Sequence, residues 1–164
     1  MDTRRIWLLL TGALVLGALV VGRQLAAKPH APAESLLPVS PRRVQAVYER
    51  FGAVQVSFLR RGGEWVRGGS QGNATARVDP FLSALAGIPR RSVTSLGGQK
   101  QAFGLTRPQL VLTLTSVGGT HRTLLLGGPA PSGDGYYAAL QGGREVFLVR
   151  PREADLLSSL ARSP

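Results

Sequence analysis

The region from 103 to 149 consists of short apolar runs that glycine-rich segments separate. In chain order these runs are 110–115, 123–126, 136–140 and 146–149. Runs of this length, rich in Val, Leu, Thr, Tyr and Phe and bounded by glycine, are typical of strands joined by hairpins. In the first run Leu110, Leu112 and Leu114 occupy alternate positions. Successive strand residues point to opposite faces, so this spacing predicts a leucine face that packs against a core.

A hairpin followed by a helix is predicted between 54 and 89. Val54, Val56 and Phe58 alternate, and a turn at 60–63 leads into a second run at 64–66. Asp79 followed by Pro80 predicts a helix start, and Gly87 with Pro89 predicts its end. The apolar face of this helix would hold Phe81, Leu82, Leu85 and Ile88. Pro151 predicts the start of another short helix, with Ala154, Leu157, Leu160 and Ala161 facing inward.

The segment from 41 to 52 fits two structures. Ser40 as N-cap, Pro41 at the first helical position and Gly52 as a stop favour an amphipathic helix. The apolar residues of that helix would be Val44, Val47, Tyr48 and Phe51. A strand over 44–51 is the alternative, and the pattern alone leaves the choice open.

An uncharged segment of 17 residues, 6–22, follows Arg4 and Arg5 near the N-terminus. As a helix it would be roughly 25 Å long, close to the thickness of a thin bilayer core. Arginines before it predict that the N-terminus is inside and the remainder outside the cytoplasm. A cleaved signal peptide is the alternative, but this apolar run is longer than the usual signal core, so we favour an uncleaved anchor. A lipoprotein anchor is excluded because the chain has no cysteine.

Together these patterns predict three regions: an N-terminal transmembrane anchor or signal peptide over 1–23, a proline-rich linker over 24–41, and a single domain over 42–164. The linker contains Pro29, Pro32, Pro38 and Pro41, which favour an extended spacer, and His30 there has no neighbouring metal ligand. The expected fold class is α+β: a mostly antiparallel sheet of hairpins with two or three short helices, preceded by one transmembrane helix.

The formal net charge is +11, and arginine rather than lysine supplies almost all of it. Such an excess is typical of affinity for phosphate-rich polymers or anionic lipid surfaces. Here the arginines are scattered and never exceed two in a row. A solvated basic surface is therefore the simpler interpretation.

No catalytic, cofactor or metal site is predicted. His121, the one histidine of the predicted domain, follows a glycine turn, and with two histidines and no cysteine the chain has no zinc-like spacing. The acidic residues have structural explanations: Asp79 as a helix cap, Glu64 and Glu145 at strand starts, and Asp134 in the loop at 127–135. The six Gly-Gly pairs match no phosphate-binding motif and are typical of turns. Asn73-Ala74-Thr75 fits the N-glycosylation pattern in a predicted loop.

The chain resembles domain-of-unknown-function family 4340 over roughly 44–160. The resemblance rests on the hairpin at 61–65, the helix at 78–88 and the Phe-Gly-Leu-Thr-Arg-Pro box at 103–108. It also includes the Leu-Gly turn within 124–128, the Tyr136-Tyr137 strand and the run at 146–149. It implies a membrane-anchored envelope protein of bacteria, in some cases encoded beside ABC transporters of the gliding-motility type, and it carries no catalytic residues. We expect Phe103 and Leu105 to be packing residues.

Two functional hypotheses follow. The first is a non-catalytic accessory or assembly module of a membrane complex that binds a protein partner. Its anchor would cross the bacterial inner membrane once, and its C-terminal domain would lie outside the cytoplasm. In this hypothesis the partner would contact the loop at 127–135 and the turn at His121. The alternative is a basic domain that binds an anionic envelope polymer or lipid headgroups. Neither predicted helix is basic enough to read nucleic acid, so we expect no nucleic-acid partner. Because no catalytic site is predicted, we also expect no enzyme.

Overall fold

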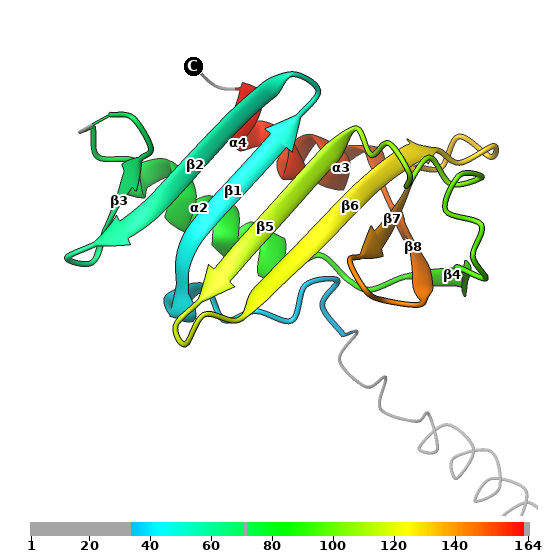
Figure 1. Ribbon diagram of the computed structural model, residues 1–164, viewed down its shortest axis with the longest axis horizontal. Coiled ribbons are helices and arrows are strands. Elements are labelled where there is room, and N and C mark those ends of the chain that lie inside the picture. Colours follow the sequence, from blue (N-terminus) through cyan, green and yellow to red (C-terminus); the bar gives the residue numbers. More distant parts are fainter. Residues whose placement is uncertain (1–33, 71, 163–164) are drawn as a thin grey trace, which may run out of the picture. The chain divides into compact units, whose positions relative to one another are not determined.

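A computed structural model describes residues 34–70 and 72–162, and its main feature is one eight-stranded sheet (Figure 1). The strand order across the sheet is β3-β2-β1-β5-β6-β7-β8-β4, and every neighbouring pair is antiparallel. The strands are β1 (Val44–Phe51), β2 (Val54–Arg61), β3 (Glu64–Arg67), β4 (Ser92–Ser95), β5 (Leu110–Ser116), β6 (His121–Pro129), β7 (Tyr136–Leu140) and β8 (Glu145–Val149).

In the part of the chain that the structure describes, the helices lie on one face of this sheet (Figure 1). They are a short 3-10 helix η1 (Pro41–Arg43) and the α-helices α2 (Thr75–Ala86), α3 (Pro151–Leu157) and α4 (Ser159–Arg162). The α+β class and the antiparallel sheet of hairpins are therefore confirmed. The predicted anchor at 1–23 lies outside the described residues, and none of the helices within 34–70 and 72–162 is long and apolar enough to cross a bilayer.

The main core forms between the helices and the sheet, as the alternation of leucines predicted. Leu110, Leu112 and Leu114 of β5 are fully buried and pack in one cluster with residues of α2 and α3. Trp65 of β3 joins this cluster, and its indole Nε1–H donates to Asp79 Oδ1 of α2 at 2.8 Å. A buried tryptophan needs a partner for this N–H, so the bond ties the edge strand to the helix layer.

The segment 44–51 is a strand, and the helix hypothesis for it is wrong. β1 lies between β2 and β5 and pairs along its length with both. Ladder hydrogen bonds on two sides outweigh a helical apolar spacing, because tertiary context overrides local propensity. The helix-start signals at Ser40 and Pro41 produce only the single turn η1.

Helix α2 begins at Thr75 and not at Asp79 as predicted, and the start at 78 that the family resemblance implied is also too late. The side chain of Asn73 accepts a hydrogen bond from the Thr75 N–H at 2.8 Å, which satisfies one of the free donors of the first turn. Pro80 therefore lies inside the helix, and Asp79 binds Trp65 instead of capping. The predicted end at Gly87 is confirmed.

A smaller apolar cluster lies on the opposite face of the sheet, over β6, β7 and β8. The loop between β4 and β5 supplies Leu96, Phe103 and Leu105, which pack on Ala139 and Val146. Phe103 also meets the Tyr137 ring edge-on, with centroids 4.9 Å apart. Phe103 and Leu105 are thus packing residues, as expected, and the Phe-Gly-Leu box covers this half of the outer face.

The box approaches β6 backbone to backbone at Gly127 and Gly128. The Gly128 N–H donates to the Phe103 carbonyl oxygen at 2.9 Å, and the Gln109 side chain donates to the Gly127 carbonyl at 2.7 Å. A Cβ added at Gly127 would collide with the Phe103 carbonyl oxygen, whereas one added at Gly128 would lie 3.9 Å from it. Gly127 is therefore required for this close approach.

Replacing Gly127 by alanine should destabilise the domain far more than replacing its neighbour. Gly127→Ala forces the box away from β6 and should lower the free energy of unfolding by about 3 kcal/mol, whereas Gly128→Ala should change it by less than about 1 kcal/mol. Urea titration of the full chain carrying Trp7→Phe, followed through the emission of buried Trp65, measures both. Equal losses for the two variants would contradict the proposed contact.

Candidate functional site

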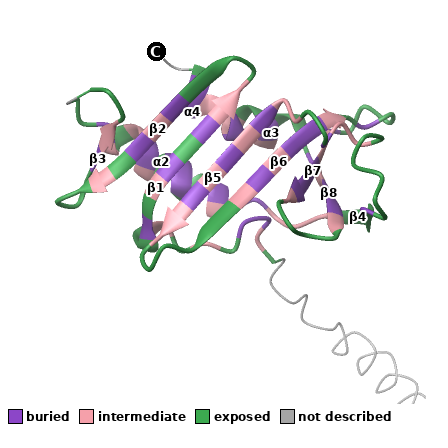
Figure 2. Cartoon of the chain, viewed as in Figure 1, coloured by how far each residue is buried: buried purple, intermediate pink, exposed green. Residues whose placement is uncertain are grey.

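Half of the outer sheet face, over β3, β2, β1 and β5, is covered neither by the helices nor by the Phe-Gly-Leu box. We call this surface the bare face; its residues are Ala46, Tyr48, Arg50, Gln55, Ser57, Leu59, Arg61, Glu64, Val66, Val111, Thr113 and Thr115. In Figure 2, exposed and half-buried residues alternate with buried ones along these strands. The alternation is that of a sheet with one face packed and the other solvated.

Large side chains lie near the middle of the bare face. Tyr48 is 36% exposed and lies between Ser57 and Thr113 of the neighbouring strands. Leu59 is 42% exposed and pairs with Val66. The centre of the face is therefore aromatic and aliphatic, although it is exposed to solvent.

Two arginines flank this centre. Arg50 pairs in register with Gln55 and Val111, and Arg61 pairs with Glu64 at the edge of the sheet. Within the described residues, neither guanidinium forms an ion pair with a carboxylate. The bare face thus offers the two arginines to a partner, with Glu64 as the one acidic side chain among its described residues.

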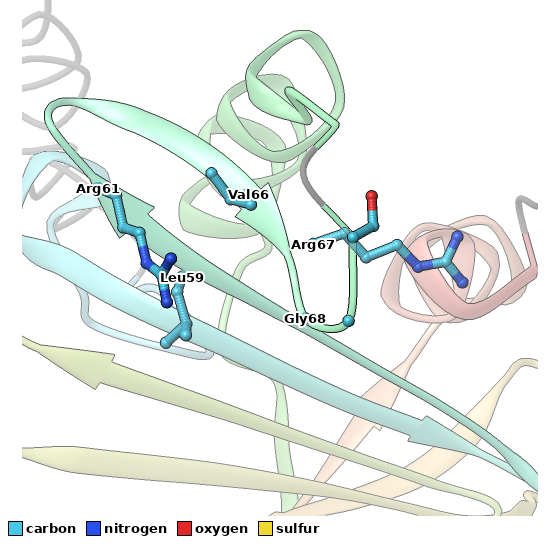
Figure 3. Close-up of a pocket in the computed structure, with 7 residues that line it drawn as sticks. Leu59, Arg61, Val66, Arg67 and Gly68 are labelled. Carbon is cyan, nitrogen blue, oxygen red and sulfur yellow. The ribbon is translucent and has the colours of Figure 1, made fainter.

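A hollow of about 420 Å³ opens beside the bare face at the end of β3 (Figure 3). It is lined by Leu59, Arg61 and Val66 and by the segment from Arg67 to Ser70. In Figure 3 the two guanidinium groups lie apart: that of Arg61 is beside Leu59, and that of Arg67 is beyond Gly68. The hollow is therefore not a paired-arginine anion site, but it has room for a side chain of a docked partner.

The residues singled out from the sequence are dispersed in the structure. His121 begins β6, is exposed, and its Nδ1 lies 3.0 Å from the Thr115 hydroxyl. Glu64 and Glu145 begin strands as predicted, and Glu145 forms an ion pair with Arg90 at 2.9 Å. Asp134 lies in the turn between β6 and β7. Over the described residues, no group of three or more His, Asp or Glu side chains is placed to hold a metal ion.

The predicted glycosylation motif is part of the β3–α2 connection. Asn73 forms a bridge with Val66 and accepts from the Thr75 N–H, while the Thr75 hydroxyl accepts from the Trp65 N–H at 2.9 Å. Both residues that define the motif are therefore engaged in holding the edge strand to α2.

Glu49 is the functional group that the sequence interpretation missed. Its side chain is fully buried in β1, on the core side between Val56 and Leu112. One carboxylate oxygen accepts the Ala161 N–H of α4 at 3.0 Å, and the other has no partner among the described residues. The spacing of Val47, Glu49 and Phe51 would have placed Glu49 on the core face once a strand was assumed.

Burial raises the pKa of Glu49 from its ordinary value of 4.5 to about 7. The backbone N–H groups of Ala161 and Leu160 and the positive charge of Arg162 oppose this rise in pKa. These N–H groups belong to the first turn of α4, where helix donors lack intrahelical acceptors. Because Glu49 is fully buried and accepts the Ala161 N–H, its carboxylate acts on the chain itself, as a cap for α4.

The stability of the domain should fall as the pH rises from about 4.5 to about 7, because over this range Glu49 is ionised in the unfolded chain but still protonated in the core. The folded pKa lies above the unfolded one, so this contribution is complete below pH 4.5 and lost above about pH 7. Its size is about 3 kcal/mol. Glu49→Gln keeps an acceptor for the Ala161 N–H but cannot ionise. The free energy of unfolding of this variant, relative to that of wild type, should therefore rise by about 3 kcal/mol from about pH 4 to about pH 8.

Denaturant titrations across this pH range measure the difference, with Glu64→Gln, at an exposed position, as the control. The control should follow the wild-type curve. Parallel curves for Glu49→Gln and wild type would show that Glu49 does not titrate in this window.

Comparison with known proteins gives one family match. A family model described as "Domain of unknown function (DUF4340)" matches residues 67–163, which is more than half of the chain. The match includes the Phe-Gly-Leu box and the helices α2, α3 and α4, and it confirms the resemblance that the sequence indicated. It begins at the end of β3, so most of the bare face precedes it. No curated protein and no solved structure matches the chain.

Proposed function

We propose that this chain, which belongs to the DUF4340 family, is a non-catalytic accessory module that is anchored in a membrane and docks a protein partner through its bare face. In this proposal residues 6–22 span the bacterial inner membrane once, and the folded domain lies outside the cytoplasm. Arg4 and Arg5 before the apolar segment support this orientation.

The bare face is the observation that carries the proposal. It combines Tyr48 and Leu59 with Arg50 and Arg61, and tyrosine and arginine are among the residues that dominate binding energy at protein interfaces. The neighbouring hollow, lined by Leu59 and Val66, suits an inserted side chain of the partner. A polar margin of serine, threonine and glutamine around this centre has the arrangement of an interface core and rim.

The charges of the bare face suggest the chemistry of the partner. Because Arg50 and Arg61 have no carboxylate partner among the described residues, a partner with acidic side chains around an apolar patch complements them. The resemblance to proteins encoded beside ABC transporters suggests a subunit of such a transport system. An integral membrane partner also fits a chain that is itself anchored.

A photo-reactive side chain on the bare face should capture this partner in intact membranes. With p-benzoylphenylalanine in place of Tyr48, we expect a cross-linked heteromeric product, since this position is solvent-accessible without a partner. The same group in place of Arg152, on α3 of the opposite layer, is the matched control and should give none. Adding Arg50→Glu to the Tyr48 variant should reduce the yield about tenfold.

Recovery of no product from the Tyr48 position under several cross-linking chemistries would count against the proposal. A product that survives Arg50→Glu unchanged would show that charge complementarity plays no part in docking.

Topology reporters test the placement of the domain. Of two reporters fused after Pro164, one active only outside the cytoplasm and one active only inside it, the first should be active, because the arginines precede the apolar segment. Replacing Arg4 and Arg5 by glutamate should reduce this bias. A reporter active in the cytoplasm for the wild-type chain would overturn the proposed orientation.

A further inference from the structure

A second surface lies at the end of the sheet where β1 begins and β5 ends. It consists of Arg42 and Arg43 in η1, Val117 in the β5–β6 turn and Arg122 near the start of β6, and we call it the basic rim. A hollow of about 200 Å³ lies within it, lined by residues that include Arg43, Val117 and Arg122. No acidic residue lines this hollow.

The basic rim is held in place by backbone contacts. The Val117 N–H donates to the Arg43 carbonyl oxygen at 2.7 Å, which joins the β5–β6 turn to η1. The Arg60 side chain donates to the Arg42 carbonyl oxygen at 3.3 Å. The guanidinium groups of the rim itself are left to solvent: Arg42, Arg43 and Arg122 are exposed and form no ion pair with a carboxylate among the described residues.

An apolar side chain stands among these charges. Val117 is 51% exposed at the tip of a turn that continues with Gly118 and Gly119. A turn that presents an apolar residue between arginines matches a membrane surface, where phosphates overlie an apolar layer. A soluble anionic polymer would offer charge to the arginines and no apolar layer to Val117.

The described chain starts beside the segment that leads into β4 and runs from there to η1 (Figure 1). Leu36 and Leu37 are 1% and 0% exposed, and the Leu36 N–H donates to the Ile88 carbonyl oxygen at 2.8 Å. The end of the segment expected to be linker is therefore packed into the domain. The stretch between the apolar segment 6–22 and this packed part is 23–33, which can span at most about 40 Å.

We propose that the basic rim docks on anionic lipid headgroups of the same bilayer that holds residues 6–22. Arg42, Arg43 and Arg122 bind lipid phosphates, for which the planar guanidinium is suited, and Val117 enters the headgroup layer. This inference rests on the anchor in the proposed function, because only an anchored chain keeps the whole domain within reach of the bilayer.

The absence of cysteine from the chain allows a direct test. The full chain carrying Val117→Cys, labelled with a polarity-sensitive fluorophore, is reconstituted into vesicles of phosphatidylcholine alone or mixed with phosphatidylglycerol. Emission should shift to the blue only in the vesicles that contain phosphatidylglycerol. The shift should vanish at about 1 M salt, where the screening length falls to about 3 Å. A label at Ser132→Cys, in the turn between β6 and β7, should not shift in either vesicle.

Arginine substitutions test the charges. Each of Arg43→Ala and Arg122→Ala should lower the ratio of docked to undocked label about fivefold. Arg152→Ala removes an equally exposed charge from α3, in the helix layer away from the rim, and should leave the ratio unchanged.

Other outcomes separate the possible failures. Failure of the wild-type chain to float with either vesicle would overturn the anchor and this inference with it. Flotation of the labelled Val117→Cys chain with no shift in its emission would overturn the lipid contact alone and leave the anchored module intact. If dextran sulfate added to phosphatidylcholine vesicles produced the same blue shift, the basic rim would bind an anionic polymer, and the lipid assignment would be wrong.

Discussion

The contact of Phe103 with Gly127 and Gly128 decides which part of the sheet is covered. Helices pack on only one face, so the other face must be polar enough for water or be covered by another segment. Over β6, β7 and β8 the outward residues include Leu125, Tyr137 and Val146, which are apolar. The Phe-Gly-Leu box covers them, and it can lie close to β6 only because Gly127 has no Cβ. Where β1, β2 and β5 present serine, threonine and arginine beside Tyr48 and Leu59, no segment within 34–70 and 72–162 covers the sheet, and the bare face results.

Glu49 imposes the opposite kind of constraint, because a carboxylate in an apolar core is costly when it is charged. Its position is explained by the break between α3 and α4 at Ser158. The Ser158 hydroxyl donates back to the Ala154 carbonyl, so the serine does not cap the next turn. The Ala161 N–H then finds its acceptor across the layer, on β1. Helix α4 is thus held by a side chain far away in sequence, and the stability of α4 depends on the protonation of that side chain.

Much of the fold could be predicted because its signals are local. Alternating leucines and glycine-bounded runs specify β5 to β8, and Pro151 specifies the start of α3, each from a few adjacent residues. The errors arise where contacts with segments distant in sequence determine the secondary structure. Residues 44–51 have a helical apolar spacing, but β2 and β5 on both sides make them a strand. The start of α2 depends on Trp65, since the Ala74 N–H and the Thr75 hydroxyl bind its backbone. Strand β4, whose residues are all exposed, forms only because β8 provides an edge for pairing.

The candidate surfaces could not be predicted for the same reason. Register across three strands brings Tyr48 beside Ser57 and Thr113, and the scattered arginines give no sign in sequence of which of them share a surface. The two surfaces also stand in a fixed relation, since the basic rim lies at the ends of the strands whose sides form the bare face. If the rim rests on lipid, β1 and β5 extend away from the bilayer, and the bare face is directed parallel to the membrane plane. An anchored partner beside the chain would then meet Tyr48 and Arg50 without either protein leaving the membrane, so the rim would favour docking by fixing orientation before any contact is made.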